Sequence, residues 1–356
     1  GNEALFLCPG ANDSVIHSGM TLAATTLLSL AVFIAVLVLT GLVRNALRRR
    51  SILDHPNERS SHEIPTPRGG GWGLIPVVIA GWLVVGHLDV LPLGGMLLLC
   101  GLAMGLGALS WWDDLGGLSP AIRLLGQGAV VAAALIVHPA PGPYFGGLLP
   151  PVLDLAVAGV LWVWYINLFN FMDGIDGISA VETICTGAGI AVVAMIAGVD
   201  APLADLGLVT MAGALGFLLW NWQPAKIFLG DIGSVPLGFL LGWLLLTLAA
   251  SGQWAAALII PGYYLADATI TLFRRALRRE KVWRPHRQHF YQRAVQKGAG
   301  HARVSLAILA ANVLLIGLAA FAALAQPGLA LAGAALVVAG LLAFLNGGAG
   351  ARREAG

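Results

Sequence analysis

Five aspartates stand just outside apolar runs of the sequence, in three separate segments. Asp113 and Asp114 lie in WWDDLGGLS, Asp173 and Asp176 in NLFNFMDGIDGIS, and Asp231 in KIFLGDIGS. Carboxylates that converge without partners repel one another, so a cluster of them indicates a bound cation. Oxygen ligands favour a hard ion, and Mg²⁺ usually takes one or two carboxylates and leaves its other positions to water and phosphate oxygens. The five aspartates therefore predict metal-assisted chemistry on a phosphate.

A basic segment near the C-terminal end adds partners for phosphate oxygens. Residues 274–303 hold ten of the 20 Lys and Arg residues, and the same segment contains His286, Arg287 and His289. These side chains supply positive charge and hydrogen-bond donors suited to phosphate groups. Each feature also has a structural explanation, because Asp-Gly is a common turn and a basic loop orients a membrane protein. Carboxylates, a cation and basic side chains together favour phosphoryl transfer.

The composition places these residues in a membrane protein. Hydrophobic residues make up 58% of the 356 residues and charged residues 11%, with a mean hydropathy of +0.83, whereas a soluble domain has roughly 45–50% apolar residues. A helix needs about 20 apolar residues to cross the hydrocarbon core. We therefore predict an all-α, polytopic chain that forms one transmembrane domain over residues 1–356. The eleven expected spans are 21–43, 71–87, 92–110, 119–137, 153–170, 179–199, 204–222, 232–250, 254–273, 304–325 and 329–346.

The positive charges give this bundle an orientation. With the N-terminus outside, the inside segments hold all 20 Lys and Arg residues, counting Arg123 one turn into the fourth span. The positive-inside rule predicts such a bias, and one miscounted span would reverse every later loop. The aspartate segments fall on the same inside face, which is therefore the expected active face. The inside segments are 44–70, 111–118, 171–178, 223–231, 274–303 and 347–356.

Asp267 lies appreciably inside an expected span, about two turns from its inside end. An ionisable residue buried in a membrane helix is a functional candidate. Arg274 offers a structural alternative, because a separation of seven residues puts both side chains on one helix face. The sequence leaves both explanations open.

The ordered motifs resemble those of a known enzyme family. The chain resembles the polyprenyl-phosphate N-acetylhexosamine-1-phosphate transferases of glycosyltransferase family 4. That family includes the enzymes that start O-antigen and enterobacterial common antigen synthesis and the phospho-MurNAc-pentapeptide translocase. The resemblance runs from about residue 54 to 301 and rests on DHPNERSSHEIPTPRGGG, WWDD, NLFNFMDGIDG, FLGDIGS and HRQH, in that order.

The resemblance implies a reaction and a set of roles. A sugar phosphate passes from a UDP-N-acetylhexosamine to undecaprenyl phosphate at the cytoplasmic face of the bacterial inner membrane, and UMP is released. It implies Asp231 and Asn170 as ligands of Mg²⁺, for which Mn²⁺ could substitute. Asp113 and Asp114 resemble the catalytic pair that engages the lipid phosphate. The residues expected at the nucleotide and sugar are Asn167, Asp173, Asp176, His286, Arg287 and His289.

The first inside loop is expected to hold the lipid phosphate. Its polar side chains stand beside the PTPRGGGWG turn that leads into the second span, where a head group at the membrane surface could be bound. A topological anchor followed by a Pro/Gly turn is the alternative. The candidate residues of this loop are Arg59, His62, Thr66 and Arg68.

Elementary phosphate chemistry constrains the mechanism. A phosphate monoester has a second pKa near 6, so the lipid phosphate is largely dianionic at neutral pH and hardly needs a strong base. We expect it to attack the sugar-linked phosphorus directly, with Asp113 or Asp114 orienting it or accepting its residual proton. A two-step route with an aspartate as covalent nucleophile is the alternative.

Departures from the family motifs bear on the donor. The sequence Pro285-His286-Arg287-Gln288-His289 lacks the translocase's run of consecutive histidines, which argues against UDP-MurNAc-pentapeptide, although that donor remains the alternative. The segment looks closest to the O-antigen or capsule branch, with UDP-GlcNAc or UDP-6-deoxy-N-acetyl sugars as donors. The lysine common after the Asp pair is also missing, and Arg123 could substitute for it.

Two other classes are less consistent with the sequence. A CDP-alcohol phosphotransferase carries DGxxAR followed by further Gly and Asp, whereas this chain reads DGIDGISAVETICTG. A lipid-linked transporter should place charges at mid-membrane in broken helices, and here the acids line one face. We expect membrane lipids as partners and no nucleic acid, and a homodimer remains open.

Overall fold

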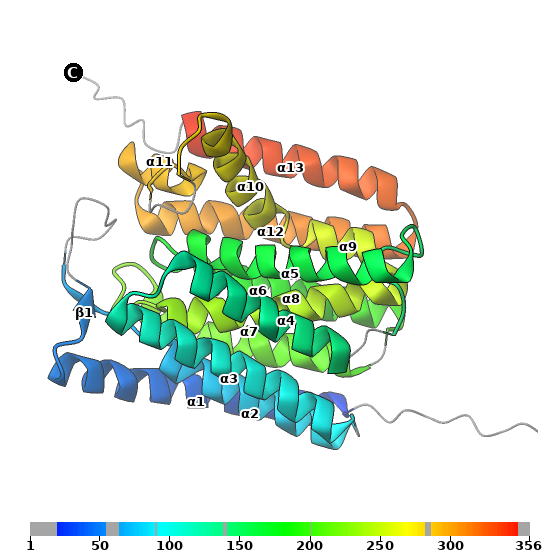
Figure 1. Ribbon diagram of the computed structural model, residues 1–356, viewed down its shortest axis with the longest axis horizontal. Coiled ribbons are helices and arrows are strands. Elements are labelled where there is room, and N and C mark those ends of the chain that lie inside the picture. Colours follow the sequence, from blue (N-terminus) through cyan, green and yellow to red (C-terminus); the bar gives the residue numbers. More distant parts are fainter. Residues whose placement is uncertain are drawn as a thin grey trace, which may run out of the picture.

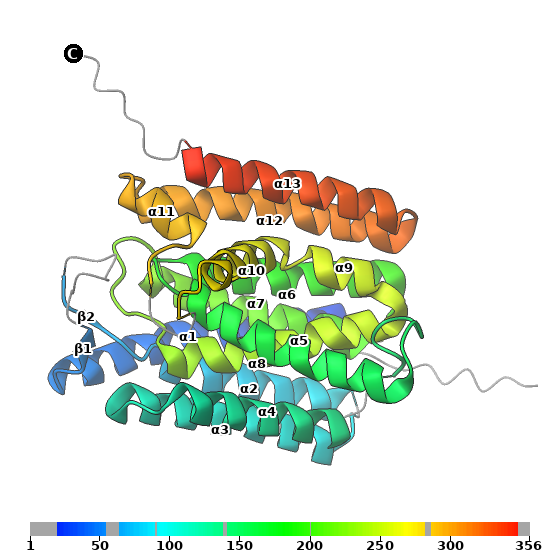
Figure 2. The ribbon, with the colours of Figure 1, turned by 45° about the horizontal axis from the view of Figure 1, so that its top comes forward.

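The structure is a computed structural model that describes residues 20–54, 64–89, 91–137, 141–199, 201–281 and 286–347. Most helices run side by side in one bundle, with the α12–α13 pair on one side and the α3–α4 pair on the other (Figures 1 and 2). The helices are α1 (Leu22–Arg49), α2 (Gly71–Leu88), α3 (Leu93–Gly116), α4 (Pro120–Val137), α5 (Pro151–Met172), α6 (Ile178–Ala197), α7 (Ala201–Asn221), α8 (Asp231–Leu248), α9 (Trp254–Ile259), α10 (Gly262–Leu277), α11 (Phe290–Gln296), α12 (His301–Leu324) and α13 (Pro327–Gly347).

The described residues contain ten helical runs that are long and apolar enough to cross a membrane, where the sequence predicted eleven spans. The all-α, polytopic class is confirmed. The difference arises after α8, where the π-helical turn η1 (Ala249–Gln253) contains Gly252 outside helical geometry, at φ 92°. The expected span 254–273 is then divided at Pro261 into α9 and α10, because proline cannot continue a helical hydrogen-bond ladder. In Figure 1, α10 leaves the common direction of the bundle.

The core of the bundle is built from α6, α7 and α8. Helix α8 is apolar all round and is buried along nearly its whole length, as expected for a helix surrounded by others. Helix α1, by contrast, exposes one apolar face that includes Leu27, Leu30 and Ile34. An exposed apolar face on a helix of this length is consistent with contact with lipid.

A short hairpin ties the first loop to the segment before α8. Strands β1 (Leu53–Asp54) and β2 (Thr66–Pro67) are antiparallel, and Arg68 then forms a bridge with Phe228. The backbone N–H groups of Gly69 and Gly70 both donate to the carbonyl of Phe228, at 3.1 and 2.8 Å. Segments about 160 residues apart in sequence therefore meet where α2 and α8 begin.

Two glycines make this junction possible. Gly230 has a φ of +73°, a conformation that side-chain-bearing residues rarely adopt, and it sets the start of α8 at Asp231. At Gly71, a Cβ atom would lie 2.4 Å from the backbone of Gly233. The starts of α2 and α8 thus cross with their backbones in contact, which places Arg68 directly beside Asp231. The junction lies at the same end of the bundle as α11, on the left of Figure 1.

Candidate active site

Arg68 joins two of the predicted aspartates. Its Nη2 atom lies 3.1 Å from Asp114 Oδ1 at the end of α3 and donates to Asp231 Oδ1, at 2.7 Å, at the start of α8. Burial by itself would lower the pKa of Arg68, but the negative charges of Asp231 and Asp114 outweigh burial and raise it. The guanidinium is therefore permanently charged and holds the two carboxylates together. The second oxygen of Asp114, Oδ2, is buried and accepts no hydrogen bond.

Asp113, the neighbour of Asp114, has both oxygens engaged. Its Oδ1 accepts from the N–H of Leu118 at 2.6 Å, and its Oδ2 lies 2.9 Å from Nη1 of Arg123 on α4. The sequence suggested Arg123 as a replacement for a missing lysine, and the structure places it beside the Asp pair. The two aspartates thus differ in chemistry, because only Asp114 has a carboxylate oxygen without a partner.

A cavity of about 200 Å³ opens between α3, α4, α5 and α8 beside these pairs. One part of its lining is polar and the other is apolar, so that it can hold a charged group and a hydrocarbon chain side by side. The polar lining comprises Ser110, Asp113, Arg123, Gln127, Asn167, Asn170 and Asp231. The apolar lining comprises Leu106, Leu109, Pro120, Leu124, Phe171 and Val235.

The amide of Asn167 is fixed by a residue that the motifs did not identify. Its Nδ2 donates to Oε1 of Gln127 at 2.6 Å and to the carbonyl of Val163 at 2.8 Å. Both amide protons of Asn167 are therefore used, and Gln127 lines the cavity beside it. The only sequence signal for Gln127 was an amide inside an apolar span, which by itself does not distinguish a buried structural residue from a ligand.

Asp173 is held by the start of the following helix. The hydroxyl of Ser179 donates to its Oδ1 at 2.7 Å. Burial raises the pKa of Asp173 to about 6, although the Ser179 hydrogen bond opposes the rise. At neutral pH the carboxylate is mostly ionised, and it becomes protonated as the pH falls through 6.

Asp176 has partners of a structural kind. Its side chain accepts from the N–H of Ala225 at 3.0 Å and lies 3.3 Å from Nδ1 of His301, while its carbonyl accepts from the hydroxyl of Ser305 at 2.9 Å. These contacts join the loop between α5 and α6, which carries Asp173 and Asp176, to α12 and to the segment before α8. Asp176 does not line the cavity beside Asp231, so the structure does not bring it to the other predicted residues.

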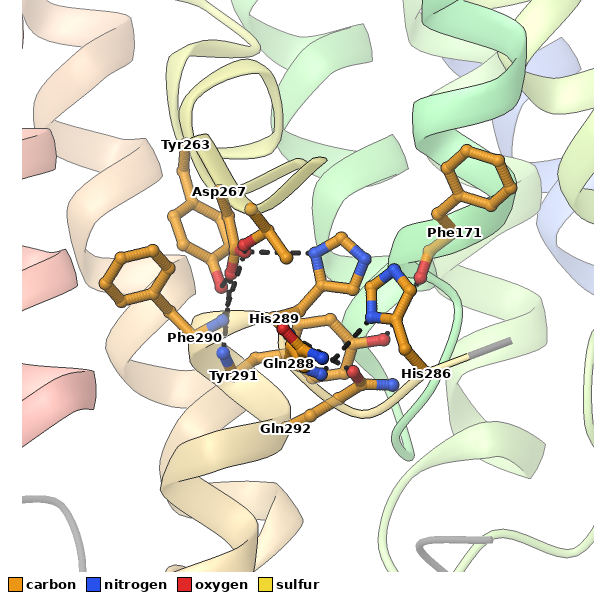
Figure 3. A network of polar contacts seen from close by, with 10 residues as sticks. Phe171, Tyr263, Asp267, His286, Gln288, His289, Phe290, Tyr291 and Gln292 are labelled. Carbon is orange, nitrogen blue, oxygen red and sulfur yellow. Dashed lines mark hydrogen bonds and ion pairs between the residues drawn. The ribbon is translucent and has the colours of Figure 1, made fainter. Parts of the chain in front are cut away.

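Asp267 is the centre of a buried hydrogen-bond network (Figure 3). Its carboxylate accepts from the hydroxyl of Tyr263 at 3.0 Å, and it lies 3.1 Å from Nδ1 of His289. Further donors to Asp267 are Thr271 Oγ1 and the backbone N–H groups of Phe290 and Tyr291. Asp267 therefore folds the segment from 286 onwards back against α10.

The alternative pairing of Asp267 with Arg274 is wrong. The Arg274 guanidinium lies instead over the ring of Phe290, 5.3 Å from its centroid. A separation of seven residues aligns two side chains along a helix, but the N–H groups of Phe290 and Tyr291 at the start of α11 donate to Asp267 from outside that helix, which the sequence spacing cannot reveal.

The histidine segment has one buried and one more accessible ring. His289 is 2% exposed and is committed to Asp267, whereas His286 lies next to it with the ring centroids 4.9 Å apart. Burial, followed by the nearby His289 and Arg275, lowers the pKa of His286 to about 4. His286 is thus neutral at physiological pH, and the expectation that it supplies positive charge is corrected. Arg287 follows His286 in the sequence, and its carbonyl accepts from Nε2 of Gln296 at 2.8 Å.

The predicted lipid-phosphate residues divide into three groups. Arg68 reaches the aspartates, as described above. Thr66 is buried in β2, where its hydroxyl donates to the carbonyl of Ile64 at 2.9 Å, and it does not line the cavity. Arg59 and His62 lie outside the described residues.

Comparison with known proteins tests the resemblance. Residues 96–249, which include all five aspartates, match the model of glycosyl transferase family 4. This stretch of the chain is similar to that family. A Bacillus subtilis protein named "probable undecaprenyl-phosphate N-acetylglucosaminyl 1-phosphate transferase" is 29% identical, over 78% of this chain and 78% of that protein. The decaprenyl-phosphate N-acetylglucosaminephosphotransferase of Mycobacterium leprae is 28% identical, over 86% of this chain and 84% of that protein.

A third relative is similar over a shorter stretch. The phospho-N-acetylmuramoyl-pentapeptide-transferase of Rhodococcus opacus is 36% identical over 129 residues, which is 33% of each chain. The resemblance inferred from the ordered motifs is thus confirmed. The protein is a multi-pass membrane protein that is similar to the transferases of glycosyl transferase family 4, and its paired aspartates and arginines lie at one end of the bundle.

Proposed function

We propose that this family 4 transferase moves an N-acetylhexosamine 1-phosphate from a UDP-sugar to undecaprenyl phosphate and releases UMP. The observation that carries the proposal is the pairing of Arg68 with both Asp114 and Asp231 beside a cavity that is polar on one side and apolar on the other. A polyprenyl phosphate has the same two-sided chemistry. The names of the bacterial and mycobacterial relatives support the same reaction class.

The site is suited to Mg²⁺. Asp231 and Asn170 line the same cavity and offer a carboxylate and an amide oxygen. Within the described residues no three His, Cys, Asp or Glu side chains converge as a closed metal cage. Mg²⁺ commonly binds through one or two carboxylates and completes its shell with water and substrate phosphates, so the residues fit it. When bound, it would neutralise the diphosphate of the donor.

The two aspartates of α3 have different roles toward the acceptor, the lipid phosphate. Asp114 has a buried oxygen with no hydrogen-bond donor, so it is placed to orient the lipid phosphate and to accept its residual proton. Asp113 positions Arg123, which can bind phosphate oxygens. An oxygen of the lipid phosphate attacks the sugar-linked phosphorus, and the bond to the UMP phosphate breaks. A covalent aspartyl intermediate is not needed, because the attacking phosphate is already a nucleophile at neutral pH.

We propose UDP-GlcNAc as the donor and surface polysaccharide as the product pathway. The printed names of the relatives mention N-acetylglucosamine, which favours it over the 6-deoxy-N-acetyl sugars. We place the enzyme in the bacterial cytoplasmic membrane with the aspartates facing the cytoplasm. The position of all 20 Lys and Arg residues at or near the inside segments supports this orientation.

The test follows UMP release by the purified protein in detergent with undecaprenyl phosphate and Mg²⁺. The donors are UDP-GlcNAc, UDP-GalNAc, UDP-6-deoxy-N-acetyl sugars and UDP-MurNAc-pentapeptide. Asp231→Asn is compared with Asp89→Asn, a matched change at the other end of α2, where Asp89 accepts from the N–H of Met20. We expect UMP from UDP-GlcNAc, its loss in Asp231→Asn and its retention in Asp89→Asn.

Each result is decisive for one part of the proposal. Release from another donor alone would replace the assigned sugar and keep the reaction class. Full activity of Asp231→Asn, or activity that survives complete chelation of divalent ions, would contradict the metal site. A folded protein without activity on any donor would refute the reaction itself.

A further inference from the structure

A second polar cluster lies between α5, α6 and α12, and it involves residues of the helix that follows Asp173 and Asp176. Glu182 is completely buried, and so are Thr186 and Asn312, while Tyr165 is 5% exposed. Nδ2 of Asn312 donates to Oε2 of Glu182 at 2.8 Å. None of these residues lines the cavity beside Asp231, so the proposed reaction does not use them.

Four oxygen atoms of this cluster have no hydrogen-bond partner. They are Glu182 Oε1, Asn312 Oδ1, Thr186 Oγ1 and the Tyr165 hydroxyl. Buried polar atoms are nearly always paired, so four orphans in one place indicate a missing ligand. Within the described residues all four unpaired atoms of this cluster are oxygens, and the amide nitrogen of Asn312 already donates to Glu182. The ligand must therefore satisfy oxygen atoms.

The three residues that carry the other oxygens are neighbours of Glu182. Thr186 follows Glu182 by four residues on α6, which puts both side chains on one face of the helix. The Tyr165 hydroxyl neighbours Thr186 and lies in the field of Glu182. Asn312 reaches the carboxylate from α12. Three helices thus converge on Glu182 from different directions.

The charge of the cluster indicates the kind of ligand. In the part of the chain that the structure describes, Glu182 makes no ion pair with a Lys, Arg or His residue. A buried carboxylate without a counter-ion is strongly unfavourable, and membrane proteins pair such groups or use them to bind ions. One carboxylate balances one positive charge, whereas a divalent ion would leave an excess charge in the interior.

We propose that Glu182, Asn312, Thr186 and Tyr165 bind a single monovalent metal cation, with Na⁺ as the ion to test. A carboxylate, an amide carbonyl and two hydroxyls form an all-oxygen shell of the type that hard cations prefer. A proton on Glu182 would also neutralise its charge, but a proton supplies one hydrogen-bond donor, whereas a metal ion can bind all four oxygens at once. The ion ties together α5, α6 and α12.

A cation bound at this site would also affect Asp173, which lies at the end of the bundle that holds the other predicted aspartates. Ser179 begins the same helix and donates to Asp173, and its hydroxyl lies 3.5 Å from that of Tyr264. Tyr264 in turn lies in the field of both Glu182 and Asp173. A cation that holds α6 in place therefore stabilises the segment that carries Asp173.

The experiment measures thermal unfolding of the full-length protein in detergent at pH 7.5. NaCl replaces choline chloride at constant ionic strength, and KCl forms a parallel series. We expect Tm to rise with Na⁺ and to saturate, as it does for a ligand that binds only the folded state. Glu182→Gln should abolish the Na⁺ response. Thr186→Val, which keeps the charge, should raise the half-saturating Na⁺ concentration about tenfold.

A matched control lies on the same helix. Thr183→Val makes the same substitution at a buried hydroxyl that donates to the carbonyl of Ser179 at 2.7 Å and is not part of the cluster. Its Na⁺ response should equal that of the unsubstituted protein. Equal responses to Na⁺, K⁺ and choline, or an equal shift in Thr183→Val and Thr186→Val, would overturn the proposal. A Tm that depends on pH but not on Na⁺ would show that Glu182 holds a proton instead. If Glu182→Gln fails to fold, Thr186→Val decides the question.

Discussion

Asp113 and Asp114 are adjacent in sequence, yet the structure predicts different consequences when each is changed to asparagine. Both oxygens of Asp113 are paired, with Leu118 and Arg123, whereas Asp114 keeps a buried oxygen without a donor. Asp114 can take the residual proton of the lipid phosphate only while its own carboxylate is ionised, and burial, followed by the charge of Asp231, raises the pKa of Asp114 to about 7. With a second phosphate pKa near 6, roughly 99% of the acceptor is dianionic at pH 8, but about three-quarters is monoanionic at pH 5.5.

The expected loss of kcat/KM in Asp114→Asn follows from the ionisation states of the acceptor and of Asp114 at each pH. Positioned proton transfer typically contributes 10²- to 10⁴-fold to a rate. At pH 5.5 the carboxylate of Asp114 is mostly protonated and resembles asparagine, so we expect Asp114→Asn to lower kcat/KM about 10²-fold at pH 8 and by a smaller factor at pH 5.5. Asp113→Asn should give a loss of similar size at both pH values, because it acts through Arg123.

The Asp114→Asn substitution should change the free energy of unfolding far less than it changes the activity. The ion pair of Asp114 with Arg68 at 3.1 Å has a gross attraction of about 5 kcal/mol at an effective dielectric constant of about 20. Desolvation of Asp114 and its repulsion of Asp231 oppose this attraction, and Arg68 retains Asp231 in the variant. We therefore expect the free energy of unfolding to change by no more than about 1 kcal/mol.

The assay is UMP release under kcat/KM conditions from pH 5.5 to 8, expressed as the ratio of unsubstituted protein to variant at each pH. The ratio cancels every titration that both proteins share, including that of Asp173. A ratio for Asp114→Asn that stays constant with pH would refute the proton-accepting role. A pH-dependent ratio in Asp113→Asn alone would assign that role to the other aspartate.

Three further predictions concern the surrounding residues. Because the pKa of Asp173 is about 6, activity should fall as pH drops through 6, and Ser179→Ala, which removes the opposing hydrogen bond, should move the midpoint to higher pH in a pH–rate profile. Asp267→Asn should lower Tm markedly and cost about 2–4 kcal/mol, because it disturbs several buried donors at once, while Arg274→Ala should change Tm little. His286→Asn should leave the shape of the profile between pH 5 and 9 unchanged, because the pKa of His286 is about 4 and the ring is neutral throughout; a lost inflection in that range would contradict this.

The sequence was sufficient for the features that depend on local composition. Inside a membrane, an apolar run of about 20 residues can pair its backbone N–H and C=O groups within the run by forming a helix. Ten of the expected spans accordingly correspond to observed helices. The order of the five motifs was enough to identify the family. The expected span at 254–273 failed because a hydropathy window averages over Pro261 and does not register that one missing N–H divides the helix.

Tertiary structure decided which polar side chains meet. Nothing in the spacing showed that Arg68 lies between Asp114 and Asp231, because four helices separate the two aspartates in the chain and Arg68 reaches both of them where the backbones of α2 and α8 touch. Likewise, Asp267 could be recognised as unusual from its place inside an apolar span, but two of its donors, the N–H groups of Phe290 and Tyr291, come from a later helix. The sequence determines which residues are energetically unfavourable when they are exposed or unpaired. Long-range packing alone determines which partners they find.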